Sequence, residues 1–304
     1  MHIGDDEVWS GTTSTSFDVD DPGFHGVEGD SDNGISFTMD VVTGTDTQAP
    51  NDFLAVYQDA GAGSDRTPRY TGTSYVVMRA KDTLASAGEG GYVGNAPQMK
   101  PWKFEVTRMP ALFSGQAGVQ NTINTDDANP VNVLYEVLTN TDWGLAFNPG
   151  DIDIGTGSSF KDAADTCITE GLGFSMVMVK AMVAKDLIAE LERHIDGVLH
   201  LDMRTGVWKI KMARADYVIG NVPALTVDNV IKVRDFSQGS WAETVNQVQV
   251  KFNQRDNDYK ETYASSADSA NYLIQGGGTT TTGVNVSTKV AFPGVKHADT
   301  AATL

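Results

Sequence analysis

The chain has 304 residues and a net charge of −18, which gives room for two or three domains of ordinary size. Apolar residues make up 40% and charged residues 20%, a balance typical of a globular protein rather than a disordered one. Residues 1–65 hold fourteen acidic residues and no Lys or Arg. Because contacts with nucleic-acid phosphates require positive charge, we expect no specific nucleic-acid binding.

The single cysteine, Cys167, excludes an intrachain disulfide and any metal site built from several thiolates. It falls on the apolar face of a predicted helix, where we expect it to be a small buried hydrophobic side chain. The first ten residues, MHIGDDEVWS, carry acids where a signal peptide has a basic region. No apolar run approaches the ~20 residues of a membrane span, so we expect none.

The first part of the chain, residues 1–110, has the pattern of strands separated by turns, and we expect an all-β domain. Residues 35–42 alternate apolar and polar side chains, as a half-buried strand does. Residues 52–58 are a short apolar run whose type the pattern leaves open. The predicted strands are residues 35–42, residues 68–80 with an interruption at Gly72, and residues 100–109 with Trp102, Phe104 and Val106 on one face.

Residues 111–217 predict a compact α+β module of three helices and a small antiparallel sheet. The first helix begins at Asn129-Pro130, a capping residue followed by Pro at the first helical position. The second opens at Ser159, with Asp162 three residues later as a weaker form of the capping box, and ends at Gly171.

The module continues with a third helix and a hairpin. Residues 185–196 predict the helix, with Gly197 as its C-terminal stop. Residues 199–203 and 207–212 alternate as two hairpin arms, and Gly206 supplies the positive φ of the turn. Residues 174–179 predict one further strand.

Residues 218–304 return to a strand pattern and predict a β-rich, tube-like domain that looks truncated at its end. The predicted strands are residues 227–233, 245–253, 259–264 and 284–291; residues 276–283 form a loop, and the last residues read as a helix just begun. The overall expectation is a multidomain, β-rich α+β fold, in which barrel-like or sandwich-like domains flank the α+β module.

The acidic residues are the first candidates for chemistry, because a polysaccharide-cleaving enzyme needs a pair of carboxylates. Asp18, Asp20 and Asp21 could flank a sugar or a calcium ion, but a solvated loop explains them better. Residues 28–34 resemble a calcium loop superficially, although the glycine is one place late and no bidentate Glu follows.

The other candidates have structural explanations. His194 and His200 are six residues apart, and no carboxylate at ligand spacing completes a metal site with them. We expect His194 to favour the helix C-terminus through its dipole. The glycine-rich stretch 88–94 has no Lys and opens no helix, so phosphate binding is not expected there. Trp102 and Trp208 on strand faces are better explained as core or interface than as sugar platforms. The histidines are His2, His25, His194, His200 and His297. We therefore predict no catalytic, cofactor or metal residues.

Six stretches follow one another in an order that is similar to a known family. Three lie in the middle module: NPVNVLYEVLTNTDWGLAF (129–147), SSFKDAADTCITEGLGFSM (158–176) and LIAELERHIDGVLHLDMRTGVWKIKMARADY (187–217). Two precede it, RYTGTSYVVM (69–78) and YVGNAPQMKPWKFEVTRMP (92–110), and residues 243–276 follow it. The series resembles phage tail-tip hub proteins, which include the lambda-type host-specificity protein and the hubs of gene transfer agents.

The resemblance implies a structural virion protein and not an enzyme. A homotrimeric hub would close the distal end of the tail tube, at the tail tip or baseplate, after assembly in the host cytoplasm. Its β-barrel-like domains would continue the tube, with the tape measure protein and the DNA path inside. The implied partners are other copies of the chain, the distal tail protein or tail tube, the tape measure protein, and a tail fibre or receptor-binding protein.

A typical family member has a further strand-rich segment before residue 1 and a long receptor-binding region after residue 304. We expect a split or minimal gene here, or other proteins that supply those parts, so the resemblance implies the hub role without receptor recognition. Two alternatives stay open. One is a tail-associated enzyme that degrades cell-wall or capsular polysaccharide, and the other is a carbohydrate-binding β protein.

Overall fold

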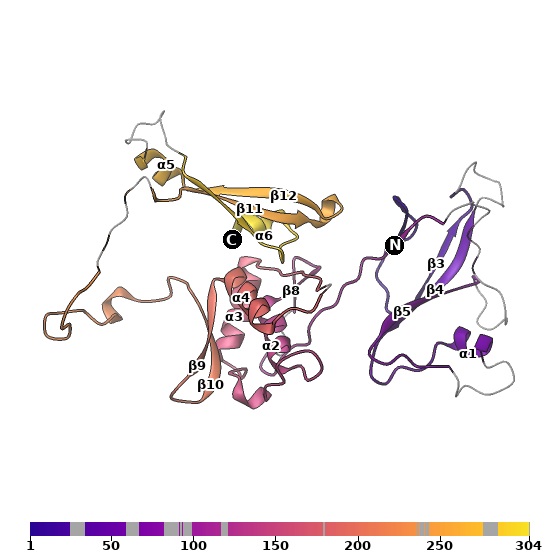
Figure 1. The fold of residues 1–304 in the computed structure, drawn as a ribbon, viewed down its shortest axis with the longest axis horizontal. Coiled ribbons are helices and arrows are strands. Elements are labelled where there is room, and N and C mark those ends of the chain that lie inside the picture. The colour runs from indigo at the N-terminus through magenta and orange to yellow at the C-terminus, as the bar shows by residue number, and fades with distance from the viewer. Residues whose placement is uncertain are drawn as a thin grey trace. The chain divides into compact units, whose positions relative to one another are not determined.

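The structure is a computed structural model, and it describes residues 1–24, 34–58, 67–81, 91, 93, 99–116, 121–178, 180–235, 237, 240, 243–275 and 285–303. The chain divides into two compact units, Met1–Val106 and Thr107–Leu304 (Figure 1). Its sheets are small and are combined with helices, so the predicted β-rich α+β class is confirmed. No sheet in the described ranges closes into a barrel, because each has at most three strands.

The first unit contains two three-stranded antiparallel sheets. One joins β3 (Ser16–Asp21), β4 (Ile35–Thr43) and β5 (Ser74–Arg79) in that order, and the other joins β2 (Asp6–Glu7), β1 (His2–Ile3) and β6 (Trp102–Lys103). Ile35, Phe37 and Met39 of the central strand β4 are buried in the core, so the strand predicted at 35–42 is confirmed.

Two predictions for this unit are wrong. Residues 52–58 form helix α1 (Asp52–Gln58), so the unit is not all-β; Asn51 caps the helix by accepting a hydrogen bond from the Leu54 amide. The strand predicted at 100–109 is reduced to β6. Within residues 100–109 only Trp102 and Lys103 pair with β1, and Val106, beyond this pairing, is 81% exposed.

The second unit begins with the predicted three-helix module. Its helices are α2 (Pro130–Thr139), α3 (Ser159–Glu170) and α4 (Ala184–Ile195), and its hairpin is β9 (Gly197–Asp202) and β10 (Val207–Met212). Their apolar faces share one core around Leu134, Phe160 and Leu191. The same module contains a two-stranded sheet of β7 (Thr122–Ile123) and β8 (Asp127–Ala128), and a short 3-10 helix at Pro149–Asp151.

The helix ends confirm part of the local prediction and correct the rest. Asn129 caps α2 through the Val131 amide, and Gly171 ends α3 with φ of +70°, both as predicted. The cap of α3 is Ser158 rather than Ser159, whose hydroxyl instead accepts a hydrogen bond from Ile210 of the hairpin. The C-terminal cap of α4 is Asp196, with φ of +48°, rather than Gly197, which is already paired in β9.

The predicted strand at 174–179 is reduced to one bridge. Phe174 exchanges backbone hydrogen bonds with Ala128, but the next amide, of Ser175, turns to the carbonyl of Gly294 at 2.8 Å. Strand pairing with β8 cannot continue past Phe174, because the next backbone amide donates to a different partner. Further along the segment, Val177 is 81% exposed.

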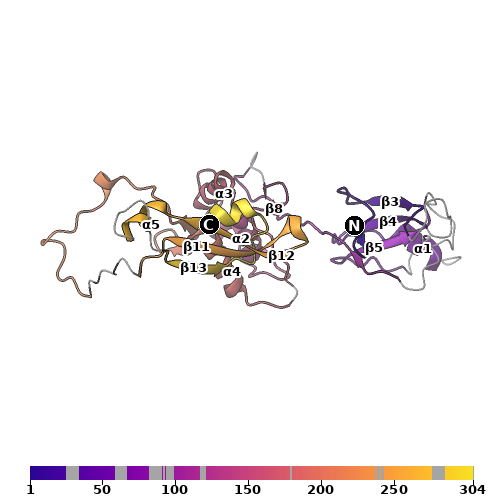
Figure 2. The same cartoon turned by 90° about the horizontal axis from the view of Figure 1, so that it is seen from above.

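The second unit ends in a three-stranded sheet with strand order β12-β11-β13. Strand β11 (Gln247–Gln254) pairs antiparallel with β12 (Lys260–Ala267) and parallel with β13 (Ser287–Ala291), close to the predicted strands. Helix α5 (Ser269–Gln275) was not predicted, whereas the C-terminal helix α6 (Ala298–Thr303) was, and α6 packs against β11 and β12 (Figure 2).

The strand predicted at 227–233 is wrong, since these residues form a turn and irregular backbone. The side chain of Val227 is 94% exposed, and no described strand pairs with the segment. The three-domain division of the sequence, with a boundary at residue 217, stays a prediction.

Candidate functional site

The predicted acidic cluster does not converge on a ligand position. The carboxylate of Asp18 accepts a hydrogen bond from the Thr38 hydroxyl at 2.5 Å, Asp20 pairs with Lys81 at 2.5 Å, and Asp21 accepts from the Gly23 amide at 3.0 Å. Among the residues that the structure describes, no group of three His, Cys, Asp or Glu side chains could hold a metal ion. Most of the calcium-like loop at 28–34, His25, and most of the glycine-rich stretch 88–94 lie outside the described residues.

The other predicted candidates are packed into cores. Cys167 is fully buried, as expected, and burial raises the pKa of its thiol to about 12. Trp102 stacks on Phe37 and Trp208 stacks on Phe147, with ring centroids 5.5 and 5.8 Å apart. Both tryptophans therefore support hydrophobic clusters rather than presenting a free ring face.

His194 is the one predicted candidate with an unusual environment. Its ring is fully buried, edge-on to Phe174 and Phe292, and its Nε2 lies 3.0 Å from the Gly173 carbonyl oxygen. Burial lowers the pKa of His194 to about 4, against the opposing effects of the Gly173 carbonyl and the Asp127 charge. The predicted dipole interaction needs a charged imidazole, so it is replaced by packing of the neutral ring.

A buried ion pair lies close to His194. Asp127 of β8 is completely buried, and its Oδ1 accepts hydrogen bonds from the Ser175 hydroxyl at 2.7 Å and from Nη2 of Arg255 at 2.8 Å. Arg255 follows β11 directly, and its backbone amide donates to the carbonyl of Lys296 at 3.1 Å. The ion pair therefore holds the C-terminal sheet onto the helical module, and we call this contact the joint.

Close packing supports the joint. The carbonyl of Gly294 accepts from the Ser175 amide, and the Thr300 hydroxyl donates to the carbonyl of Gly171 at 3.0 Å. A Cβ atom on Gly294 would lie 2.2 Å from the ring of the buried Phe174. The backbone thus approaches the ring at a distance that only glycine allows.

Gly294→Ala is expected to destabilise the second unit by about 2 kcal/mol or more, because either the Phe174 ring or the backbone at 294 must move. Gly220→Ala is the matched control, since a Cβ there meets nothing within 4 Å. The measurement is urea unfolding read at the amides of the second unit. Equal unfolding midpoints for the two variants would contradict the close packing.

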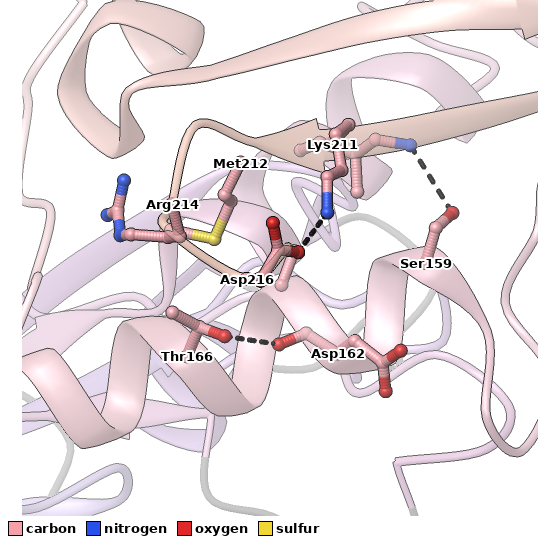
Figure 3. Close-up of a pocket in the computed structure, with 9 residues that line it drawn as sticks. Ser159, Asp162, Thr166, Lys211, Met212, Arg214 and Asp216 are labelled. Carbon is pink, nitrogen blue, oxygen red and sulfur yellow. Dashed lines mark hydrogen bonds and ion pairs between the residues drawn. The ribbon is translucent and has the colours of Figure 1, made fainter. Parts of the chain in front are cut away.

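A polar pocket of about 230 Å³ opens between α3 and the end of the hairpin (Figure 3). Lys211 pairs with Asp216 on its rim, and Arg214 turns to Glu170 with two hydrogen bonds of 2.8 and 2.6 Å. Both cations thus form ion pairs with acidic residues of the same chain, and the Arg214–Glu170 pair connects the end of the hairpin to α3. The sequence did not indicate this pocket, because packing of α3 on β10 brings its lining together.

An apolar groove of about 290 Å³ lies beside the start of α4. The buried side chains of Val137 and Leu187 contribute to its lining. Trp143, Met178 and Met182 also line it, and each is nearly half exposed.

A long apolar segment of the same unit is also open to solvent. Residues 217–233, which we call the arm, run out from the end of the hairpin (Figure 1). Within the described part of the chain, the hydrogen bonds of the arm join arm residues to one another. Its large apolar side chains with at least half of their surface exposed are Tyr217, Val218, Ile219, Val222, Leu225, Val227, Ile231 and Val233.

The groove and the arm are two features of this unit that expose large apolar side chains. Large exposed apolar patches mark interaction sites in soluble proteins. Comparison with known proteins adds the decisive observation. Residues 183–304 match a family model described as "Putative phage tail protein". The match supports a phage tail protein with a structural role in the tail. A search of the curated proteins finds no match.

The part of the chain that matches the family model contains α4, the hairpin, the arm and the C-terminal sheet. It therefore includes both Arg255 and His194 of the joint region, as well as the whole arm. No helix in the described parts of the chain is long and apolar enough to cross a membrane.

Proposed function

We propose that the chain is a structural hub of the phage tail tip or baseplate, which closes the distal end of the tail tube and attaches neighbouring tail proteins or fibres. The observation that carries the proposal is the match of residues 183–304 to a tail protein family. Six stretches resemble tail-tip hubs and follow the same order along the chain, which favours the tail tip as the position of the chain within the tail. In this role the chain forms a homotrimer and contacts the tail tube, the tape measure protein and a fibre or receptor-binding protein.

The distribution of side chains supports an assembly role rather than catalysis. Large apolar side chains are exposed along the arm and on the lining of the groove, where an assembled particle would cover them. The cationic side chains that line the polar pocket, in contrast, form ion pairs with acidic residues of the same chain. We therefore propose that the chain works through contacts with other proteins and is not an enzyme.

Electron cryomicroscopy of intact particles tests the proposal. The expected result is three copies of the chain at the distal end of the tail tube. Location along the tube wall or in the head would refute the hub, and so would absence of the chain from particles that infect normally. Antibody labelling of a tagged chain in purified virions provides an independent measurement of the same location.

A further inference from the structure

We infer that in mild acid the C-terminal sheet separates from the helical module while both stay folded, and that protonation of His194 drives the separation. The sheet carries α6 with it, because α6 packs against β11 and β12. The inference goes beyond the proposed function and does not depend on it, since it concerns a contact within one chain.

The sheet and the module have separate hydrophobic cores in the described part of the chain. The module core surrounds Leu134, Phe160 and Leu191, whereas the sheet core consists of Val250, Phe252, Phe292, Val295 and Ala301. Three strands whose apolar face is covered by a helix meet the requirement for independent stability. The arm belongs to the chain connection between the two bodies (Figure 1), and its hydrogen bonds join arm residues to one another. Separation therefore leaves both cores and the bonds of the arm unbroken.

Polar groups hold the two bodies together. In addition to the ion pair of the joint, the Ser175 amide donates to the carbonyl of Gly294 at 2.8 Å, and Nη2 of Arg193 donates to the carbonyl of Ala291 at 2.7 Å. Water replaces each of these partners when the bodies separate, so the net contribution of such bonds is small. The two charges of the ion pair likewise regain their hydration when they separate, which offsets part of the lost attraction.

His194 lies between the two cores. Its fully buried ring is edge-on to Phe174 of the module core and to Phe292 of the sheet core. Burial lowers the pKa of the ring to about 4, although the Gly173 carbonyl and the Asp127 charge oppose this effect. Separation uncovers the side of the ring that Phe292 covers, and contact with water restores the ordinary proton affinity of an imidazole.

The charged groups of this region come from both bodies. Asp127 is the acid that favours a charged His194, but it is already paired with Arg255 at 2.8 Å. Arg193, the preceding residue of α4, disfavours that charge, and the sheet adds Lys296, which interacts with both Asp127 and Arg255. Protonation of His194 therefore favours the separated state, in which solvent reaches the imidazolium.

Amide hydrogen exchange of the full chain tests the inference, because two neighbouring amides report different events. The Ser175 amide donates to Gly294 of the sheet, whereas the Phe174 amide donates to Ala128 within the module. Separation exposes the first amide and leaves the second protected. The amides of β11 that pair with β12 report unfolding of the sheet itself.

Two results are expected in the wild type. The Ser175 amide is at least about tenfold less protected than the Phe174 amide and those of β11, because separation requires less free energy than unfolding. Its protection, corrected for the intrinsic exchange rate, falls about 20-fold between about pH 7 and pH 5. This factor follows from a His194 pKa of about 4 in the joined state and 6.5 in the separated state.

His194→Gln is expected to abolish the fall in Ser175 protection. His194→Phe keeps a ring between Phe174 and Phe292, so it provides the same test with the packing preserved. His200→Gln, at an exposed position of β9, is the control for the loss of an imidazole.

Three outcomes would overturn the inference. Equal protection of the Ser175 and Phe174 amides would mean that the sheet separates only when the module unfolds. Low protection of the Ser175 amide that does not change with pH would mean local fraying, without a role for His194. A fall that persists in both His194 variants would assign the acid response to another group. Each of these outcomes leaves the hub proposal intact, because that proposal fails only on the location of the chain in the particle.

Discussion

Asp127→Asn is expected to destabilise the second unit by about 3–5 kcal/mol, which is the typical cost of removing one partner from a buried ion pair. The Asp127 side chain is completely buried, and that of Arg255 is 15% exposed. Loss of the carboxylate charge leaves the guanidinium in the joint without its closest counter-charge, and it weakens the bond from the Ser175 hydroxyl. The substitution lowers the free energy of unfolding, because the joint connects elements that are 128 residues apart in the sequence.

The neighbouring acid provides a matched control. Asp126 lies 3.9 Å from the same guanidinium, but its side chain is 55% exposed. Asp126→Asn is therefore expected to cost less than about 1 kcal/mol, because an exposed ion pair is weakened by solvent. Urea unfolding with hydrogen exchange read in β8 and β11 compares the two variants. Similar small losses for both would show that the buried pair does not hold the C-terminal sheet in place.

A double variant distinguishes the energy of the ion pair from the separate contributions of its two residues. Asp127→Asn combined with Arg255→Met removes both charges, and its stability is expected to recover part of the loss, since no charge is left buried without a partner. If the double variant is instead less stable than Asp127→Asn by the full cost of a second substitution, the two residues act independently.

The local features of the fold were predictable because short stretches of sequence determine them. Asn129-Pro130 places a cap and a proline where the first turn of a helix requires them, and Gly171 adopts the positive φ that ends the next helix. The hairpin of β9 and β10 was found from alternation and one turn glycine, Gly206, with φ of +73°.

The joint could not be predicted in the same way. Asp127 and Arg255 have no local pattern that marks them, and they meet only because the C-terminal sheet packs on the helical module. His194 was noticed for its place near a helix end, but its neutral state depends on Phe174 and Phe292, which belong to distant parts of the chain. Burial by tertiary contacts decides the chemistry of such residues, and a single sequence does not reveal those contacts.

The arm shows why apolar pattern alone can mislead. The apolar residues at 227–233 predicted a strand, yet the segment is irregular, and Val227 and Ile231 are exposed. The pattern states that these side chains require an apolar partner surface, and it does not state whether that surface belongs to the same chain or to another one.

The second unit is expected to lose about 3 kcal/mol of stability as the pH falls from about 6.5 to about 4, through His194 alone. The unfolded chain has the ordinary pKa of 6.5, whereas burial lowers the folded value to about 4. Between these values the unfolded state binds a proton that the folded state does not, so acid favours unfolding. The contribution is fully present above the unfolded pKa and is lost progressively toward the folded one.

His194→Gln removes the titrating group and keeps a side-chain amide that can donate to the Gly173 carbonyl. The variant is expected to be less stable than the wild type at pH 7 but to lose less stability on acidification, so the two unfolding curves converge as the pH approaches 4. His200→Gln, at an exposed position of β9, is the control for the loss of an imidazole. Parallel pH profiles for wild type and His194→Gln would mean that His194 is not buried as a neutral ring. Convergence would instead assign acid sensitivity to the region where the C-terminal sheet meets the helical module, since Phe292 packs there against the ring.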